Sequence, residues 1–234
     1  MWVQLKENFL FVLGCAGIIA ALAVAARIAE HFLPATRRTS KTRWICTVAI
    51  CGAIASVLHI LDFPLLFLAP EFYKLDFSEL PVMLCGFYLG PTSAVACEAV
   101  KIVLKLLLKG TSTAFVGDFA NFFVGCSLVL PAAIVYHTKK SRTSALLGLL
   151  TGTVILTVFG SMFNAIYLLP KFSQLFGLPL DAIIGMGGKI NGSITSLQTF
   201  VLLAVAPLNL IKGAAISLLT ILLYKKVARP LFGK

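Results

Sequence analysis

The stretch Pro70-Glu-Phe-Tyr-Lys-Leu-Asp-Phe-Ser-Glu-Leu-Pro81 is acidic, aromatic and bounded by prolines, and it interrupts a chain made mostly of long apolar runs. Residues 62–79 hold four of the nine acidic residues and a single lysine. The backbone of such a stretch would lack hydrogen-bond partners in lipid. We therefore expect an outer loop folded over the mouth of a membrane protein, and long ordered loops tend to be functional.

The composition around this loop is that of an integral membrane protein. The chain has 234 residues, of which 59% are hydrophobic and 12% are charged, whereas a soluble domain carries roughly 25% charged residues. A membrane-spanning helix needs about 20 apolar residues. The length therefore allows six or seven spans, and we expect one all-α membrane domain with short connections.

The net charge of +11 comes largely from basic clusters that lie between or after apolar runs. Short cytoplasmic loops carry an excess of Lys and Arg, so we place these clusters inside and interpret the charge as topology rather than nucleic-acid binding. The chain is then a multi-pass protein of the cell membrane. The clusters are Arg37, Arg38, Lys41 and Arg43; Lys139, Lys140 and Arg142; and Lys225, Lys226, Arg229 and Lys234.

The apolar runs predict the helices once the basic clusters are placed inside. The helix at 80–89 is short for a span, so we expect it either to begin within the loop or to be buried in protein. Residues 171–206 should lie at the outer surface or be partly re-entrant, with an interfacial helix at 194–205. The other expected helices are 9–33, 44–61, 92–109, 118–136, 144–168 and 207–228.

Five polar residues lie at or near the ends of apolar runs, on the outer side of this topology: Asp118, Asn121, Asn164, Asn209 and Lys212. A buried, unpaired amide or charge costs several kcal/mol in hydrocarbon, so such residues face each other, a ligand or water. Together with residues 70–81 they predict a pocket for a small, flat, partly polar molecule.

Each of these residues also has a structural explanation. Lys212 can snorkel to the outer interface, although Asn209 lies three residues before it on the same helix face. A single asparagine such as Asn164 can form an interhelical hydrogen bond, and Asp118 can cap its helix. Asn121 is open to either interpretation.

Two further patterns are ambiguous from sequence. Lys101 and Lys105 share a helix face with Glu98, and pairing with that carboxylate is favoured over lining a site that would attract phosphate. Ala49 and Ala53 form a small-residue face on their helix, suited either to internal packing or to docking of a partner.

The sequence offers no chemistry for catalysis. The six cysteines lie in apolar stretches without metal-ligand spacing, so we expect no metal. His31, His59 and His137 lie near helix ends, where an interfacial position is the ordinary explanation. Since no nucleophile–base set appears, we expect no catalytic residues and no enzyme.

Several of these motifs, in order and at matching spacing over about residues 44–228, resemble one known family. They are Lys74-Leu-Asp-Phe-Ser-Glu-Leu-Pro81, Leu89-Gly-Pro91, Val116-Gly-Asp-Phe-Ala-Asn-Phe-Phe-Val-Gly125, Asn164 with Tyr167-Leu-Leu-Pro170, and Pro207-Leu-Asn-Leu-Ile-Lys-Gly213. The chain is similar to the substrate-binding (S) components of energy-coupling factor (ECF) vitamin transporters, of the riboflavin-specific type.

The resemblance implies a six-helix S-component bundle at 37–234 preceded by one additional transmembrane helix at 1–36. It implies a high-affinity riboflavin-binding subunit that mediates vitamin uptake with a coupling transmembrane subunit and two ATPase subunits in a prokaryotic plasma membrane. Riboflavin is then a transported ligand, and no cofactor is expected.

The resemblance also assigns roles to residues. It implies that Asn164, Asn209 and Lys212 contact the polar edges of the ligand. The loop residues Leu75, Asp76 and Phe77 would help close the site. Asn121 is a further candidate binding residue, from its position in the sequence and not from the resemblance. Ala49 and Ala53 would form the surface for the coupling subunit.

Alternatives remain at this point. The same fold could carry FMN or another vitamin, for which Lys101 and Lys105 would supply phosphate contacts. A small membrane enzyme acting on a lipid would need a carboxylate or histidine set that the sequence lacks, and a cation channel is disfavoured by Lys212.

Overall fold

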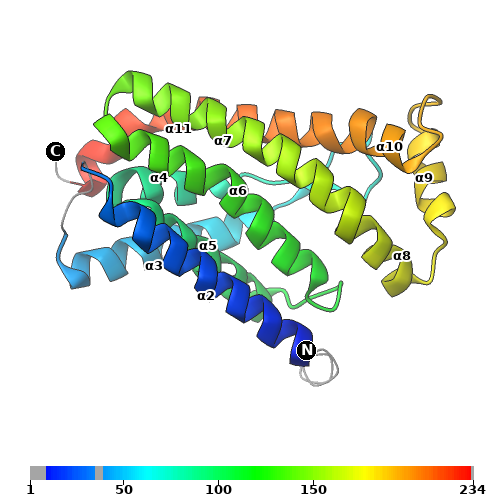
Figure 1. Cartoon of the computed structure of the whole chain (residues 1–234), viewed down its shortest axis with the longest axis horizontal. Coiled ribbons are helices and arrows are strands. Elements are labelled where there is room, and N and C mark those ends of the chain that lie inside the picture. The colour runs from blue at the N-terminus through cyan, green and yellow to red at the C-terminus, as the bar shows by residue number, and fades with distance from the viewer. Residues whose placement is uncertain (1–8, 35–38, 233–234) are drawn as a thin grey trace.

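The computed structural model describes residues 9–34 and 39–232 and consists almost entirely of helices that run up and down a single bundle (Figure 1). The helices of the first half are α2 (Phe9–His31), α3 (Lys41–Ile60), α4 (Glu79–Leu89), α5 (Pro91–Leu108) and α6 (Val116–Lys139). Those of the second half are α7 (Arg142–Phe163), α8 (Leu169–Phe176), α9 (Leu180–Gly188), α10 (Leu197–Phe200) and α11 (Ala206–Phe232).

Within the described residues, five helical runs are long and apolar enough to cross a membrane: Phe9–His31, Lys41–Ile60, Val116–Lys139, Arg142–Phe176 and Leu197–Tyr224. Two helices complete the bundle: α5 carries three charged residues, and α4 is only 11 residues long. The expected all-α membrane fold, six bundle helices and one additional N-terminal helix, is confirmed.

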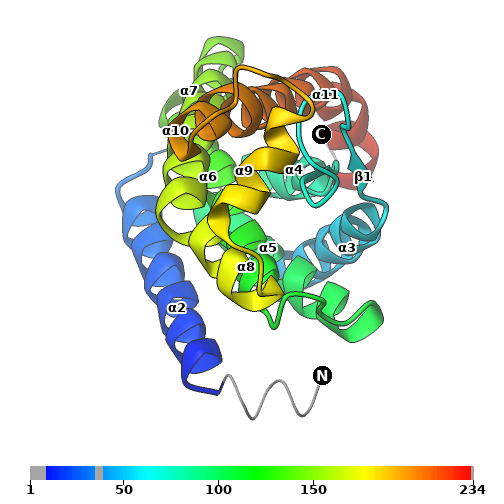
Figure 2. The same cartoon turned by 90° about the vertical axis from the view of Figure 1, so that its right-hand side faces the viewer.

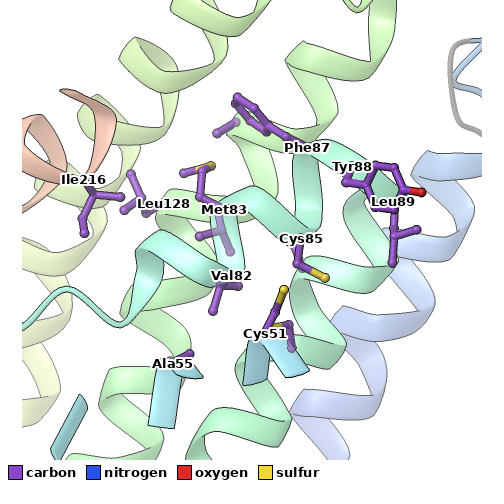
Figure 3. Packing of buried hydrophobic residues seen from close by; sticks show 14 of the residues in the cluster. Cys51, Ala55, Val82, Met83, Cys85, Phe87, Tyr88, Leu89, Leu128 and Ile216 are labelled. Carbon is purple, nitrogen blue, oxygen red and sulfur yellow. The ribbon is translucent and has the colours of Figure 1, made fainter. Parts of the chain in front are cut away.

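α4 lies at the centre of the core, as its short length predicts. Ten of its 11 residues are buried, because its sequence is apolar on every face. Phe87 stacks on Tyr136 of α6, with ring centroids 4.4 Å apart. Figure 3 shows Val82, Met83 and Cys85 of α4 pointing into this core, which is closed below by Cys51 of α3.

α2 packs on the outside of the bundle against α5 and α6 (Figure 2). It buries only Cys15 and Ala26, so most of its surface is left to lipid. The Glu30 carboxylate accepts a hydrogen bond from the Thr92 backbone N–H in the first turn of α5, at 3.3 Å. This contact satisfies one of the free N–H groups of that helix start.

The charge rule and the fold agree on the orientation of the helices. Figure 1 shows the α2–α3 connection, the α6–α7 connection and the end of α11 together at one end of the bundle. The loop after α3 and the α8–α10 region lie at the opposite end. The described members of the three basic clusters are therefore gathered at one end, while Arg37, Arg38, Lys234 and the expected boundary at 36/37 lie outside the described residues.

At two places the sequence predicts a helix boundary at a proline, but the helical run continues through that proline. The run that begins with α7 continues past Pro170 to Phe176, through a π-helical segment, η1 (Asn164–Leu168). There the Leu169 N–H bonds to the Asn164 carbonyl. The wider π turn lets Pro170 start a new α-helical turn, where its missing N–H costs nothing.

The last helix has the same construction. The sequence analysis predicts an interfacial helix at 194–205. In the structure, residues 197–205 instead form the beginning of the final span. The π segment η2 (Val201–Val205) closes with a bond from the Ala206 N–H to the Val201 carbonyl, and Pro207 follows immediately. π segments inside α-helices are frequent at functional sites.

Candidate ligand-binding site

The loop between α3 and α4, residues 62–78, forms a lid at the end of the bundle opposite the basic clusters. It contains a short antiparallel pair, β1 (Phe63–Pro64) and β2 (Lys74–Leu75). The ring of Phe72 contacts Phe172 of α8, and the ring of Tyr73 lies 6.1 Å from that of Phe200 of α10. Aromatic residues that the sequence places in a loop are thus packed against two distant helices.

Lys212 lies beneath the lid and is held by two carboxylates. Its side chain is 8% exposed. Its Nζ lies 3.3 Å from Oδ2 of Asp76 in the lid and 3.0 Å from Oε1 of Glu79 at the start of α4. The snorkelling alternative for Lys212 is therefore excluded, because its ammonium is buried inside the protein and paired with carboxylates there.

The ion pairs extend inward from Glu79. The same Oε1 atom accepts a hydrogen bond from Nζ of Lys101 at 3.2 Å, and Lys101 also lies 2.6 Å from Glu98 on its own helix. The expected Lys101–Glu98 pair is present. Lys105, in contrast, pairs with Asp118 of α6 rather than with Glu98.

Asp76 links the lid to the helices. Its Oδ2 is 3.3 Å from His59 Nδ1, and its Oδ1 accepts a hydrogen bond from the Ser78 N–H at 2.8 Å. Burial raises the pKa of the Asp76 carboxyl, but the Lys212 ammonium and the His59 hydrogen bond outweigh burial and hold that pKa well below its usual range. Asp76 is therefore a carboxylate at neutral pH.

Asn164 and Asn209 meet at Gly160 of α7. The Nδ2 of Asn164 donates to the Gly160 carbonyl at 2.7 Å, and its Oδ1 accepts from the Tyr73 hydroxyl of the lid at 2.7 Å. A Cβ on Gly160 would lie 2.7 Å from Nδ2 of Asn209. The absence of a side chain at residue 160 thus leaves room for the Asn209 amide against α7.

Asn209 differs from Asn164 in its hydrogen bonding. It is 5% exposed, and its Nδ2 has no hydrogen-bond partner among the described residues. Since Asn209 and Lys212 are three residues apart on α11, they share one face of the helix. An unsatisfied buried donor beside a buried cation is a place where a polar ligand gains most.

The remaining site residues of the sequence analysis fall in two groups. Leu75 is buried in β2, and Phe77 is half-buried with its ring 6.1 Å from that of Phe63, so both belong to the lid. Asn121 instead donates to the Gly117 carbonyl of its own helix, and Asp118 is engaged with Lys105. The structure therefore brings Asn164, Asn209, Lys212 and Asp76 together but leaves Asn121 and Asp118 apart.

Three residues of this cluster were not identified as site residues from sequence. Glu79 lies in the 70–81 stretch that the sequence assigns to the pocket, but nothing distinguishes it there from the other acidic residues. Tyr73 is one aromatic among several in the lid, and burial raises the pKa of its phenol, which keeps the hydroxyl a donor. His59, which pairs with Asp76, is buried inside the protein. His137 is also buried and bonds to the Ala133 carbonyl at 3.0 Å.

Ala49 and Ala53 lie exposed on the outer face of α3, while Gly52 between them faces inward and is buried. Ile50, Ile54 and Val57 on the same helix are each about half exposed. Internal packing does not account for the two alanines, so the small-residue face is left open to lipid or to a partner.

Two apolar grooves lie beside the polar cluster. One of about 490 Å³ separates α7 from the α10–α11 run, and one of about 280 Å³ lies between α2, α6 and α7. Neither is lined by Asn209 or Lys212. In this conformation the lid is closed onto the cluster, through the Tyr73–Asn164 hydrogen bond and the Asp76–Lys212 ion pair.

Comparison with known proteins agrees with this arrangement. Residues 43–224 match the family described as ECF transporter, substrate-specific component, so α2 lies outside the matched region. The riboflavin transporter RibU of Staphylococcus aureus (strain TCH60) is 34% identical over 184 residues, which cover 79% of this chain and 89% of that protein. The riboflavin transporter FmnP of Bacillus subtilis (strain 168) is 31% identical, with 80% and 93% covered.

A solved structure, described as the S component of a bacterial ECF transporter, is also similar. It superposes with a TM-score of 0.65 and 33% sequence identity, covering 82% of this chain and 99% of that chain. These relatives are transporters and not enzymes, in agreement with the expectation from sequence. The chain thus belongs to the ECF transporter family, as a substrate-specific component.

Proposed function

We propose that this protein is the high-affinity riboflavin-binding subunit of an ECF-type transporter and captures the vitamin beneath its lid. The observation that carries the proposal is the buried cluster of Asn164, Asn209 and Lys212 under an acidic, aromatic loop. The riboflavin transporters among its relatives support the choice of ligand.

The chemistry of riboflavin fits such a cluster. Its isoalloxazine ring is flat and largely apolar, while one edge carries carbonyl oxygens and ring nitrogens. The amide of Asn209 and the ammonium of Lys212 supply donors for these acceptors. The buried aromatic and aliphatic residues of the lid, such as Tyr73 and Leu75, supply apolar surface for the ring. Leu75, Asp76 and Phe77 would close over it.

FMN is a less suitable ligand, because the lysines that could hold its phosphate already have carboxylate partners. Lys101 is paired with Glu79 and Glu98, and Lys105 with Asp118. A phosphate carries about two negative charges at neutral pH. It would have to displace these carboxylates or be buried beside them, and either change is unfavourable.

The transport cycle follows from tight capture in a closed site. Because the lid is joined to α8, α10 and α11 by side-chain contacts, release needs an energy source outside this chain. We propose that a coupling transmembrane subunit and two ATPase subunits supply it, with Ala49 and Ala53 of α3 as the docking face. The cluster would face the outside of a prokaryotic plasma membrane, with the basic clusters inside. Residues 37–234 would form the substrate-binding domain, preceded by a separate helix at 1–36.

The direct test is a binding titration of the purified protein in detergent. Riboflavin should lose its fluorescence on binding, and the protein as purified should be yellow. FMN should compete only at much higher concentration. A colourless preparation that does not quench added riboflavin would refute the function, and stronger binding of FMN than of riboflavin would refute the choice of ligand.

A further inference from the structure

We propose that Glu79 is the acceptor that recognises the imide N–H of the bound flavin, between donors supplied by Asn209 and Lys212. This inference rests on the proposed function and specifies which protein group recognises the imide N–H of the ligand. It assigns a specificity role to a residue that the sequence places in the 70–81 stretch without a role of its own.

The first observation is the unequal use of the two Glu79 oxygens. The side chain is 1% exposed, and Oε1 accepts from both Lys212, at 3.0 Å, and Lys101, at 3.2 Å. Oε2 has no hydrogen-bond partner among the described residues. A buried carboxylate oxygen without a donor is costly, so a donor from a ligand would be strongly favoured at this atom.

The second observation is an unpaired donor on the same helix as Lys212. Nδ2 of Asn209 is buried without a partner in the part of the chain that the structure describes, and Asn209 lies on the same face of α11 as Lys212. Lys212 is in direct contact with Glu79. The cluster therefore offers two donors, from Asn209 and Lys212, and one acceptor, from Glu79.

The pyrimidine edge of isoalloxazine has the complementary pattern. It presents a carbonyl, the N3–H group and a second carbonyl in a row. Donors from Asn209 and Lys212 can each serve one carbonyl, and Oε2 of Glu79 can accept from N3–H. A hydrogen bond to a charged acceptor in a buried site is among the stronger kinds. A ligand that lacks this N–H would leave Oε2 unsatisfied.

Glu98 provides a matched control. It is also a buried glutamate paired with Lys101, at 2.6 Å. Its carboxylate, however, is enclosed against Gly125 of α6, where a Cβ would lie 2.6 Å from Oε1, and it forms no ion pair with Lys212 among the described residues. A change at Glu98 alters the same charge without touching the proposed acceptor.

The experiment compares riboflavin with N3-methylriboflavin in wild-type protein, Glu79→Gln and Glu98→Gln. In Glu79→Gln, the amide oxygen is retained by the two lysines, which need an acceptor, so the amide NH₂ replaces Oε2 and donates where an acceptor is required. Wild-type protein should bind the methylated flavin about 10- to 100-fold more weakly than riboflavin. Glu79→Gln should bind riboflavin about 10-fold more weakly and differ by less than about 3-fold between the two flavins.

Glu98→Gln and the conservative variant Glu79→Asp should keep most of the wild-type discrimination. Equal affinity of the wild type for both flavins would overturn the inference while leaving riboflavin binding intact. Retention of the full discrimination by Glu79→Gln would do the same, because it would mean that the methyl group is rejected by shape alone. If Glu79→Gln does not fold, the wild-type comparison of the two flavins decides, since equal affinity overturns the inference. Failure of the wild type to bind riboflavin at all would instead refute the proposed function.

Discussion

Lys212 and Asp76 are separated by 136 residues of sequence, yet the Nζ of the lysine lies 3.3 Å from Oδ2 of the aspartate. The pair joins the last helix to the lid, and both side chains are less than one tenth exposed. Closure of the site and the position of a proposed ligand-binding lysine therefore depend on the same contact.

Replacing Asp76 by asparagine should loosen the lid. Lys212 would keep only Glu79 as a charged partner, and we expect a loss of about 1–3 kcal/mol in the free energy of unfolding, with faster dissociation of riboflavin. Thermal unfolding and stopped-flow fluorescence would measure both effects. Asp62→Asn is the matched control, because its partners Lys74 and Lys109 are more than 40% exposed and exposed pairs contribute under about 1 kcal/mol. Equal effects of the two changes would contradict the prediction.

The lid contact should also be resistant to acid. The pKa of Asp76 is held below its usual range, so its stabilising effect is present above the unfolded-state pKa and is lost as the pH falls through the folded-state pKa. The difference in unfolding free energy between wild type and Asp76→Asn should be constant from about pH 5 to 8 and decrease only below about pH 4. Unfolding of both proteins over a pH series measures it; a decrease that begins near pH 6 would be inconsistent with a depressed pKa.

Gly160→Ala should weaken ligand binding without removing any polar group. The new methyl would lie 2.7 Å from Nδ2 of Asn209, so the amide has to move away from its position against Gly160. We expect riboflavin affinity to fall by about 1–2 kcal/mol. Gly14→Ala in α2 is the control, since nothing lies within 4 Å of its Cβ position. Unchanged affinity in Gly160→Ala would show that the position of the Asn209 amide is not critical.

Asn209→Ala and Lys212→Ala should each reduce riboflavin affinity by about 1–3 kcal/mol. Lys212→Ala should in addition lower stability, because it leaves the carboxylates of Asp76 and Glu79 without that cation. Fluorescence titration separates the effects when folding is checked by size-exclusion chromatography. Lys109→Ala, at a lysine whose side chain is 44% exposed, should bind normally. If both site variants also bind normally, the assignment of the site is wrong.

Substitution of Ala49 and Ala53 by leucine should separate binding from transport. Both side chains are exposed on α3, so larger residues fit the isolated protein but would hold a docked helix away. We expect normal riboflavin binding by the purified protein and a severe loss of riboflavin uptake in cells that supply the coupling module. Ala21→Leu, on the exposed face of α2, should affect neither property. Full uptake by the double variant would place the docking surface elsewhere.

The sequence predicted most of the helices because the bilayer imposes strong constraints on it. The expected helices at 9–33, 44–61 and 92–109 agree with α2, α3 and α5 within a few residues, since a span needs a fixed length of apolar residues. The errors are at Pro170 and Pro207, which usually end helices. The π segments η1 and η2 directly precede these prolines and allow the helices to continue through them. The sequence has no pattern from which we predicted these wider turns.

The hydrogen-bond donors of the candidate site could be predicted from the sequence, but its carboxylate–lysine pairs could not. Asn164, Asn209 and Lys212 stand out because amide and ammonium groups are rare and costly in an apolar chain. Nothing in the sequence indicates that Glu79 would share one oxygen between Lys101 and Lys212, or that Asp118 would pair with Lys105. An ion pair depends on which helix faces meet, and that follows from packing across the whole bundle.

The sequence by itself determined that the chain crosses a membrane several times, where its basic clusters lie and that a polar, aromatic loop covers one end. These properties depend on local composition, because lipid excludes charge and unpaired backbone at every residue independently. Only the tertiary structure decided which carboxylate faces which lysine, and that Gly160 leaves room for the amide of Asn209. Those relationships join residues far apart in the chain, whose distances are fixed only when the helices pack together.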